Sequence, residues 1–437
     1  MATVVISPAN VATYPEGGGH FWVHMQYVQG LLELGCDVYW LERFRRSHDE
    51  RRDRETIELF LDRMRCFGME GKVILYSTLD APGDGELPYD FLTTSRAAAE
   101  AVIDRADLLL NSYYAIELAL LNRFRCTAVL DIDPGLLQFW VSCGQLTLPA
   151  HDLYFTTGET VGTALARFGD CGVNWLHIRP PICLSRWPYV SGPSCDAMTT
   201  VSGWWGGEGK GEWVTDGDGV LFENNKRVTF MQFLDLPRRT PQVLELALCL
   251  GDGDPPEREQ FQQRGHHWNQ HHPCPKDVTQ YESDAKDRAI LEHFGWRVRS
   301  STEAAGTPQR YQRYISQSRG EFSCAKPSCM YFQNAWVSDR TICYLASGKP
   351  AIVQDTGPSE YLPNGEGMFR FSTLEQAEEA IHQVNADYSS QCRAARELAE
   401  AYFDARPVLE GMLNEALRSP LKRPDVLQLA SGREASS

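Results

Sequence analysis

The sequence lacks the features that would place the chain in a membrane or on a nucleic acid. No stretch approaches the roughly 18 to 20 apolar residues that span a bilayer, and no basic segment precedes the short run Val4–Ile6 as in a signal peptide. Only 42 Lys and Arg stand against 58 Asp and Glu, and the resulting net charge of -16 repels phosphate backbones. We therefore expect a soluble, cytoplasmic protein with no membrane and no nucleic acid among its partners.

Paired cysteines are also absent. The 13 Cys form no Cys-x-x-Cys pair, so reduced thiols are expected and not a disulfide framework. One segment holds good zinc ligands, but its adjacent histidines lack the spacing of a four-ligand site, and nothing upstream completes one. These ligands are His266, His267, His271, His272 and Cys274. We expect no metal and no resident cofactor.

What the chain has is an alternation of strand-like and helix-like segments. Its 437 residues are enough for two or three domains. Apolar runs separated by segments of helical period indicate parallel sheets, and so an α/β fold class with two Rossmann-like domains. Strands are predicted at residues 3–7, 38–41, 72–76, 107–111, 128–131, 228–233 and 351–353, and helices at 21–34, 94–103, 242–250, 285–294, 374–384 and 389–403.

A proline-rich stretch divides the chain. Consecutive prolines at 180 and 181, with further prolines at 188 and 193, cannot continue a helix or a central strand. We expect an N-terminal domain over residues 1–185 and a C-terminal domain over 195–388, with a polar insertion at 251–285. Terminal helices at 389–418 are expected to cross back to the first domain, before a frayed tail at 419–437.

The first motif is the run Gly17, Gly18, Gly19 and His20 between a predicted strand and a predicted helix. Glycines let a ligand approach the backbone, and a helix amino end favours negative charge. His20 could act as a general base because its ordinary pKa lies near neutrality. A tight turn without a ligand, with His20 as a capping or packing residue, is the alternative.

The second motif lies in the C-terminal half. It consists of Ser318–Phe322, then Ala346–Pro350, then Asp355–Gly357. Together with Gly17–Gly19 and the later Leu34–Gly35, this order resembles the GT-B glycosyltransferases, in particular the large retaining group that uses nucleotide sugars. The resemblance implies two Rossmann-like domains that face each other across a cleft, with the acceptor on the first and the donor on the second.

The chain departs from that group at one position. The group carries two glutamates seven residues apart, the second three positions before the alanine of Ala-x-Gly-x-Pro. Cys343 occupies this second position, and Glu321 lies far upstream of it. The resemblance alone implies retention of configuration, and the carboxylate that the group places at the donor is absent at this position.

The expected chemistry assigns roles to the remaining residues. A leaving nucleoside diphosphate develops negative charge, which arginine and lysine can stabilise without a metal. On the donor side we expect Lys226, Arg227, Arg319, Glu321, Asp339, Arg340, Asp355, Thr356 and Gly357, with Glu321, Arg340 and His20 as catalytic residues. On the acceptor side we expect Gly17, Gly18, Gly19, His20 and Asp133. A solvated hairpin turn for Lys226 and Arg227, and turn chemistry for Asp133, are the alternatives.

The sequence therefore predicts a glycosyltransferase of specialised metabolism. The co-substrate is expected to be a UDP- or GDP-linked sugar, and the partner a small-molecule acceptor that offers oxygen, nitrogen or sulfur, for example a small thiol. Two alternatives remain, a nucleotide-sugar epimerase of the GT-B fold and an inactive nucleotide-binding interaction protein. Neither the oligomeric state nor the acceptor follows from the residues.

Overall fold

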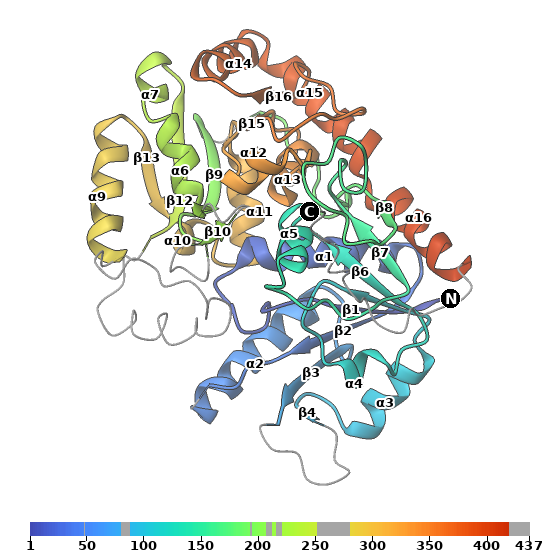
Figure 1. The fold of residues 1–437 in the computed structure, drawn as a ribbon. Helices are drawn as coiled ribbons and strands as arrows, with labels where there is room; N and C mark the ends of the chain where they lie inside the picture. Colours follow the sequence, from blue (N-terminus) through green and yellow to red (C-terminus); the bar gives the residue numbers. More distant parts are fainter. Residues whose placement is uncertain are drawn as a thin grey trace, which may run out of the picture. The chain divides into compact units, whose positions relative to one another are not determined.

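The computed structural model describes residues 1–47, 49–79, 88–192, 195–206, 212–215, 221–250 and 280–418 (Figure 1). Its chain divides into two compact units. The first comprises Met1–Pro15, His24–Pro181 and the chain from Ala405 onward, and the second comprises Glu16–Val23 and Ile182–Asp404. The histidine-rich segment His266–Cys274, most of the predicted insertion and the predicted frayed tail lie outside the described residues.

The described part of the first unit is built on an eight-stranded sheet in the order β4-β3-β2-β1-β5-β6-β7-β8. All neighbours are parallel except β3 and β4. The strands are β1 (Thr3–Ser7), β2 (Asp37–Arg43), β3 (Val73–Thr78), β4 (Tyr89–Phe91), β5 (Leu108–Asn111), β6 (Thr127–Asp131), β7 (Leu153–Thr156) and β8 (Trp175–His177). The helices are α1 (Gly18–Glu33), α2 (Glu50–Cys66), α3 (Arg96–Arg105), α4 (Leu118–Leu121), α5 (Leu136–Ser142) and α16 (Ala405–Arg418).

The described part of the second unit has a six-stranded, fully parallel sheet in the order β13-β12-β9-β14-β15-β16. These strands are β9 (Ala197–Gly203), β12 (Val243–Cys249), β13 (Arg297–Ser300), β14 (Gly320–Ser323), β15 (Ala351–Gln354) and β16 (Met368–Phe371). A short antiparallel pair, β10 (Trp213–Thr215) and β11 (Leu221–Glu223), follows β9. The helices are α6 (Lys226–Gln232), α7 (Leu236–Arg239), α9 (Gln280–His293), α10 (Ser301–Ala305), α11 (Pro308–Gln317), α12 (Pro327–Phe332), α13 (Asp339–Ala346), α14 (Leu374–Ala386), α15 (Tyr388–Leu398) and the π-helical turn η2 (Ala399–Phe403).

Both sheets have the strand order of a Rossmann fold. Numbered along the chain, β3-β2-β1-β5-β6-β7 and β13-β12-β9-β14-β15-β16 each read 3-2-1-4-5-6. The direction of winding reverses between β1 and β5 in the first unit, and between β9 and β14 in the second. In open parallel sheets, ligands bind beyond the carboxyl ends of the strands at this switch point. The predicted α/β class with two Rossmann-like domains is confirmed.

The alternating elements of the first 131 residues are where the sequence predicted them, but two later predictions are wrong. Residues 228–233 form part of helix α6 and not a strand. The β-branched and aromatic composition suggested a strand, yet Phe230, inside the helix, and Phe233, at its end, both pack into the core.

Residues 242–250 are the second error, because they contain strand β12 and not a helix. Leu, Glu and Ala have high helix propensity, but β12 lies between β9 and β13 with its interior residues buried. A strand buried on both faces shows a continuous apolar run, which periodicity cannot distinguish from a buried helix. Strand β9 itself, with Thr199 and Thr200 at its centre, was not predicted.

The proline-rich linker is bound to the second unit. Lys349 is fully buried and its ammonium donates to Val190 O at 3.0 Å and Gly192 O at 2.7 Å. The backbone amide of Ile182 donates to Phe403 O at 2.7 Å. Lys349, the lysine of the Ala346–Pro350 motif, therefore stabilises the fold by binding the linker. No helix among the described residues is long and apolar enough to cross a membrane.

Candidate functional site

The switch point of the second sheet brings together polar residues from several elements. Strand β14 pairs with β9 on one side and β15 on the other, and helix α13 packs against β14 and β15. Helix α6 is attached to the loop after β14, because Thr229 Oγ1 donates to Ala325 O at 2.6 Å. The Ser328 amide donates to Asn224 Oδ1 at 2.8 Å. The first turn of α6 is therefore held beside the carboxyl end of β14.

A buried ion pair lies at the centre of this region. Arg340 Nε donates to Glu321 Oε1 at 2.7 Å, and the guanidinium also donates to Val201 O at 2.9 Å and to the Ser323 hydroxyl. Glu321 is 0% exposed and Arg340 8%. Burial by itself lowers the pKa of Arg340, but Glu321 and nearby tyrosines together raise it, so the guanidinium stays charged. The second oxygen of Glu321 has no hydrogen-bond partner among the described residues.

Lys226, in the first turn of α6, is a second cation in this region. Burial, reinforced by the charges of Arg340 and Lys326, lowers the pKa of Lys226 to about 7. Lys326 already pairs with Glu212 at 2.9 Å. The Lys226 ammonium, by contrast, makes no hydrogen bond or ion pair with any residue in the described ranges. A poorly solvated cation without a counter-ion favours the binding of an anion.

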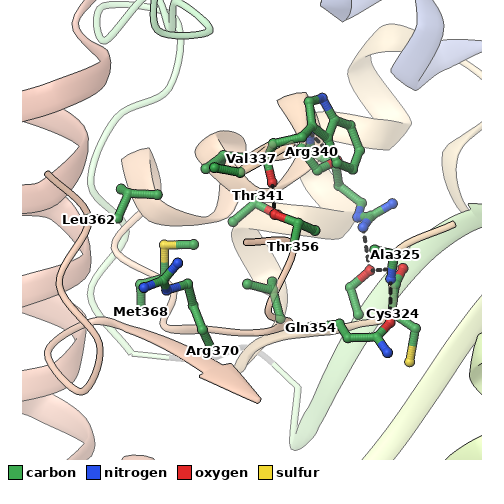
Figure 2. Close-up of a pocket in the computed structure, with 15 residues that line it drawn as sticks. Cys324, Ala325, Val337, Arg340, Thr341, Gln354, Thr356, Leu362, Met368 and Arg370 are labelled. Atoms are coloured by element: carbon green, nitrogen blue, oxygen red, sulfur yellow. Dashed lines mark hydrogen bonds between the residues drawn. The ribbon is translucent and has the colours of Figure 1, made fainter. Parts of the chain in front are cut away.

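A pocket opens next to Arg340. It encloses about 420 Å³ of empty space, part of which is open to solvent. Arg340 and Arg370 lie on opposite sides of it, with Thr356 between them (Figure 2). The lining comes from the ends of β14 and β15, the loop before α13, the first turn of α13 and strand β16: Ser323, Cys324, Ala325, Ala335, Trp336, Val337, Ser338, Arg340, Thr341, Val353, Gln354, Thr356, Leu362, Met368 and Arg370.

Two strained residues shape the loop before α13. Gln333 and Ala335 have positive φ angles of 51° and 54°, which are uncommon for residues other than glycine. The Ala335 amide donates to Thr356 O at 3.1 Å, and the Thr356 hydroxyl donates to Trp336 O at 2.7 Å. Gly357 has φ +136°, and a Cβ there would lie 2.6 Å from Gln333 O. The two loops are thus joined by contacts that require these backbone conformations.

Several of the predicted donor residues meet here. Glu321, Arg340 and Lys226 form the charged cluster, and Thr356 lines the pocket. Asp355 accepts from the Gly357 amide at 3.1 Å and from Arg370 Nη1 at 3.3 Å. Asp339 is the first residue of α13, where a negative charge is favourable to the helix.

Two predicted donor residues have other partners. Arg227 pairs with the buried carboxylate of Asp287, with Nη2 3.0 Å from Oδ1. Arg319 precedes β14 at its amino end, the end opposite to the cluster. There its guanidinium donates to Asn385 and lies over the Tyr388 ring. The structure places neither side chain with Glu321 and Arg340.

The glycine motif belongs to the second unit, although we predicted it on the acceptor side in the first. A Cβ on Gly18 would lie 2.2 Å from Ala305 O, and one on Gly19 would lie 2.7 Å from the Tyr311 ring. These two glycines therefore allow close packing against α10 and α11. His20 lies in the first turn of α1 and is half-buried. Tyr311, which contacts Gly19, lies close to the charged cluster. Burial raises the pKa of Tyr311 well above its ordinary value, and the charges of Cys343, Arg340 and Glu321 also act on its hydroxyl.

Asp133 lies in the first unit, exposed, in the turn after β6. Its amide donates to Asp131 Oδ1 at 3.1 Å, and Asp131 is fully buried. Cys343, at the position of the missing glutamate, is buried and its thiol donates to Asp339 O at 3.2 Å. No carboxylate replaces the family's glutamate at this point of α13.

The sequence prediction missed Arg370, Ser323 and Trp336. Arg370 could have been noticed, because an arginine inside the apolar run Met368–Phe371 is unusual for a buried strand. Nothing in the sequence marked Ser323 or Trp336, which join the pocket only through the fold. No group of three or more His, Cys, Asp and Glu side chains in the described ranges is arranged to hold a metal ion.

In sequence comparisons, no family model and no curated protein matches the chain. Solved structures do match. An alpha-glucosyltransferase (AGT) in complex with UDP is similar with TM-score 0.53 and 11% identity, over 95% of this chain and 100% of that one. HepE of Anabaena in complex with UDP and glucose has TM-score 0.53 and 9% identity, over 95% and 99% of the two chains.

A third similar structure is AviGT4, a glycosyltransferase involved in avilamycin A biosynthesis, with TM-score 0.50 and 12% identity over 96% and 98% of the chains. The glucosyltransferase is also known in complex with UDP and a 13-mer DNA. These likenesses show the fold of the chain, and the predicted GT-B fold is confirmed. The absence of a nucleic-acid partner stays a prediction.

Proposed function

We propose that the protein is a glycosyltransferase that moves a sugar from a nucleoside-diphosphate sugar to a small-molecule acceptor. One observation carries the proposal. At the switch point of a Rossmann-type sheet, the half-buried Lys226 has no hydrogen-bond or ion-pair partner among the described residues, and the charges of the buried Arg340–Glu321 pair act on it. A diphosphate is the anion that a ligand of this fold would bring to that point.

The reaction that we propose fits these charges. The bond between the anomeric carbon and the β-phosphate oxygen breaks, and that oxygen leaves with the electron pair. A bond from the acceptor atom to the anomeric carbon forms, and the acceptor gives up its proton. Lys226 and Arg340 stabilise the charge that grows on the leaving diphosphate. Glu321 positions Arg340, and its second oxygen can accept a hydroxyl of the ligand.

The remaining features of the proposal come from the sequence resemblance. They are a UDP- or GDP-linked donor, retention of configuration, and an acceptor from specialised metabolism. The two similar structures with UDP bound support a UDP-linked sugar, and AviGT4 supports an acceptor of that kind. His20 is proposed as the group that receives the acceptor proton, and Asp133 as an acceptor contact. Asp339, Asp355, Thr356 and Gly357 are proposed to border the sugar.

Nucleoside diphosphate binding tests the site. Isothermal titration of UDP, GDP, ADP and dTDP into the protein should identify one that binds. Lys226→Met should then weaken that binding by about tenfold or more, because a charge-assisted hydrogen bond is lost. Arg319→Met is the matched control, because Arg319 lies at the opposite end of β14 and its binding should change less than about threefold.

If none of the four diphosphates binds the wild-type protein, the proposal fails. The reaction itself is tested by incubating the protein with the matching nucleotide sugar, with and without a panel of alcohols, amines and thiols. Diphosphate release that depends on an acceptor supports the transferase. Conversion of the donor into another nucleotide sugar without an acceptor would instead identify an epimerase.

A further inference from the structure

Arg370 is an arginine in the apolar strand β16, and it lines the pocket opposite Arg340 (Figure 2). Only 16% of its side chain is exposed. Its Nη1 donates to Gly357 O at 2.9 Å and to Asp355 Oδ1 at 3.3 Å. Among the described residues, only these two oxygens accept a hydrogen bond from the guanidinium, and both accept it from Nη1.

The other edge of the same guanidinium is unused. Its Nε is buried and has no acceptor among the described residues. Nε and Nη2 form one side of the planar group, and their N–H bonds are parallel, as the two oxygens of a carboxylate require. A buried N–H without an acceptor is unfavourable, so a ligand or a water is expected at this edge.

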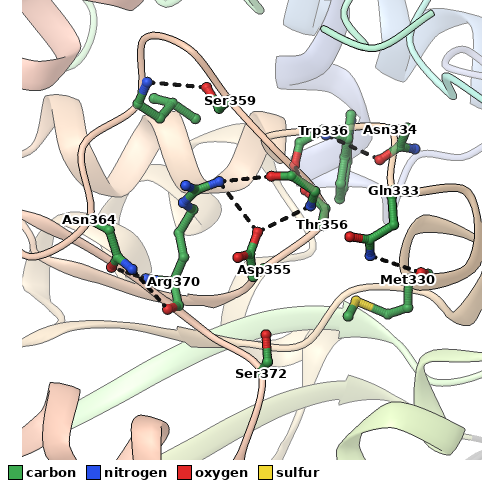
Figure 3. Close-up of polar contacts among 12 residues, drawn as sticks. Met330, Gln333, Asn334, Trp336, Asp355, Thr356, Ser359, Asn364, Arg370 and Ser372 are labelled. Carbon is green, nitrogen blue, oxygen red and sulfur yellow. Dashed lines mark hydrogen bonds and ion pairs between the residues drawn. The ribbon is translucent and has the colours of Figure 1, made fainter. Parts of the chain in front are cut away.

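The backbone around Arg370 holds this edge in place. The Arg370 amide donates to Asn364 Oδ1 at 2.8 Å, and Asn364 Nδ2 donates back to Arg370 O at 3.4 Å (Figure 3). Together with the bonds at Nη1, these contacts fix both ends of the residue. A guanidinium ordered in advance loses less entropy when it binds a planar oxyanion.

The charges that line or border the pocket form two ion pairs. Asp355 balances Arg370 from the Nη1 side, and Glu321 balances Arg340. Leu362, Met368 and Val337 supply apolar surface, against which a sugar ring can pack. The unused fork of Arg370 is therefore the feature of this pocket that would select between otherwise similar ligands.

We propose that Arg370 binds a carboxylate on the transferred sugar, so that the donor is an acidic nucleotide sugar. This inference rests on the proposed function, because the pocket shares Arg340 with the diphosphate site. The carboxylate would lie on the Nε–Nη2 edge, and the diphosphate would lie toward Lys226. A free small carboxylate is the other source of the same chemistry.

Matched donor pairs test the inference. UDP-glucose is compared with UDP-glucuronate, and GDP-mannose with GDP-mannuronate, by isothermal titration. In the wild-type protein the acidic member of one pair should bind about tenfold more tightly than the neutral member. Arg370→Lys keeps the positive charge without the fork, and Arg370→Gln removes the charge. Both variants should lose the preference, which is measured as the ratio of the two affinities within each pair, whatever happens to the affinity for the neutral donor.

Two results would overturn the assignment: equal or weaker binding of both acidic donors by the wild-type protein, or a preference that survives Arg370→Gln. Thermal shift with glucuronate alone separates the two sources. If glucuronate raises the melting temperature of the wild-type protein but not of Arg370→Lys, while the acidic donors show no preference, a separate carboxylate ligand occupies the pocket and the acidic donor is refuted. Failure of UDP and GDP to bind would instead reject the proposed function, and the glucuronate measurement would still report on Arg370.

Discussion

Two buried glutamates, one in each unit, show what distinguishes a structural carboxylate from a site carboxylate. In the first unit, Glu42 Oε1 accepts from the Val11 and Ala12 amides at 2.6 and 2.9 Å, and Oε2 accepts from Trp40 Nε1 at 2.8 Å. In the second unit, Glu321 has one oxygen on Arg340 and the other without a described partner. Both side chains are fully buried, so burial does not separate them.

The difference lies in what the surroundings leave unsatisfied. The Glu42 contacts attach the loop after β1 to strand β2, and each carboxylate oxygen has a donor. In the second unit, two buried polar atoms at this site lack a hydrogen-bond partner among the described residues, the Glu321 Oε2 and the Arg370 Nε, and the half-buried Lys226 ammonium has none either. Buried polar groups are normally paired, so a concentration of unpaired ones indicates that a ligand completes the network.

The largest expected effect comes from removing Arg340, the cation of the buried ion pair in the second unit. Arg340→Met leaves the Glu321 charge buried without a partner, and it should lower the free energy of unfolding by about 3–5 kcal/mol. Urea denaturation measures the change. The double variant Arg340→Met/Glu321→Gln removes both charges and should recover part of the loss. A single variant as stable as the wild type would contradict the role of Arg340 as the partner that stabilises the buried Glu321.

The matching change in the first unit should be smaller. Glu42→Gln replaces one carboxylate oxygen by an amide NH₂. This NH₂ group faces the existing donors and leaves at least one buried N–H unpaired. We expect a loss of about 1–3 kcal/mol of unfolding free energy in urea denaturation. Binding of the nucleoside diphosphate should stay within about threefold of wild type. A larger loss of affinity would mean that the contrast between the two glutamates is misplaced.

The third comparison is the pH dependence of diphosphate binding. The affinity should change by at most about tenfold per pH unit. The Lys226 pKa is about 7 in the unliganded protein, so above pH 7 the amine is mostly neutral. A diphosphate favours the ammonium form and raises this pKa, so binding takes up a proton. Affinity should therefore fall as pH rises from 7 toward the pKa of the complex, and the lysine should add no pH dependence below 7.

Isothermal titration between pH 6 and 9, in buffers of different ionisation enthalpy, measures this proton uptake. Lys226→Met removes the lysine but not the titration of the ligand itself, so the difference between the two proteins isolates Lys226. The same uptake in both proteins would assign the proton to another group.

The smallest expected effect concerns the strained loop before α13. Ala335→Gly relieves a left-handed conformation at φ 54° but loosens the unfolded chain, so we expect a gain of at most about 1 kcal/mol in stability. Ala101→Gly, at an exposed position inside helix α3, is the control and should lose about 0.5–1 kcal/mol. Thermal denaturation of both variants distinguishes loop strain from a general effect of glycine.

The prediction of the site from sequence was uneven for a physical reason. Glu321 and Arg340 were predicted because both lie in short segments that resemble a known order of motifs. Arg319 lies in the same segments and Arg227 was predicted as a cation for the diphosphate, yet their side chains bind Asn385 and Asp287. Which arginine faces the site depends on the direction of the side chain and on its neighbours in the fold, and sequence order contains neither.

The sequence by itself determined the α/β class, the Rossmann-like halves and most elements of the first 131 residues, although α2, β4 and α4 were not predicted. Local patterns of apolar residues suffice there, since each strand and helix is recognisable from its own period. Only the tertiary structure decided that residues 228–233 are a helix and 242–250 contain a central strand. It also decided that Gly18 and Gly19 pack on α10 and α11, and that Glu321 and Arg370 each keep a buried polar atom without a partner among the described residues. These outcomes depend on which distant residues bury each segment and satisfy its polar groups.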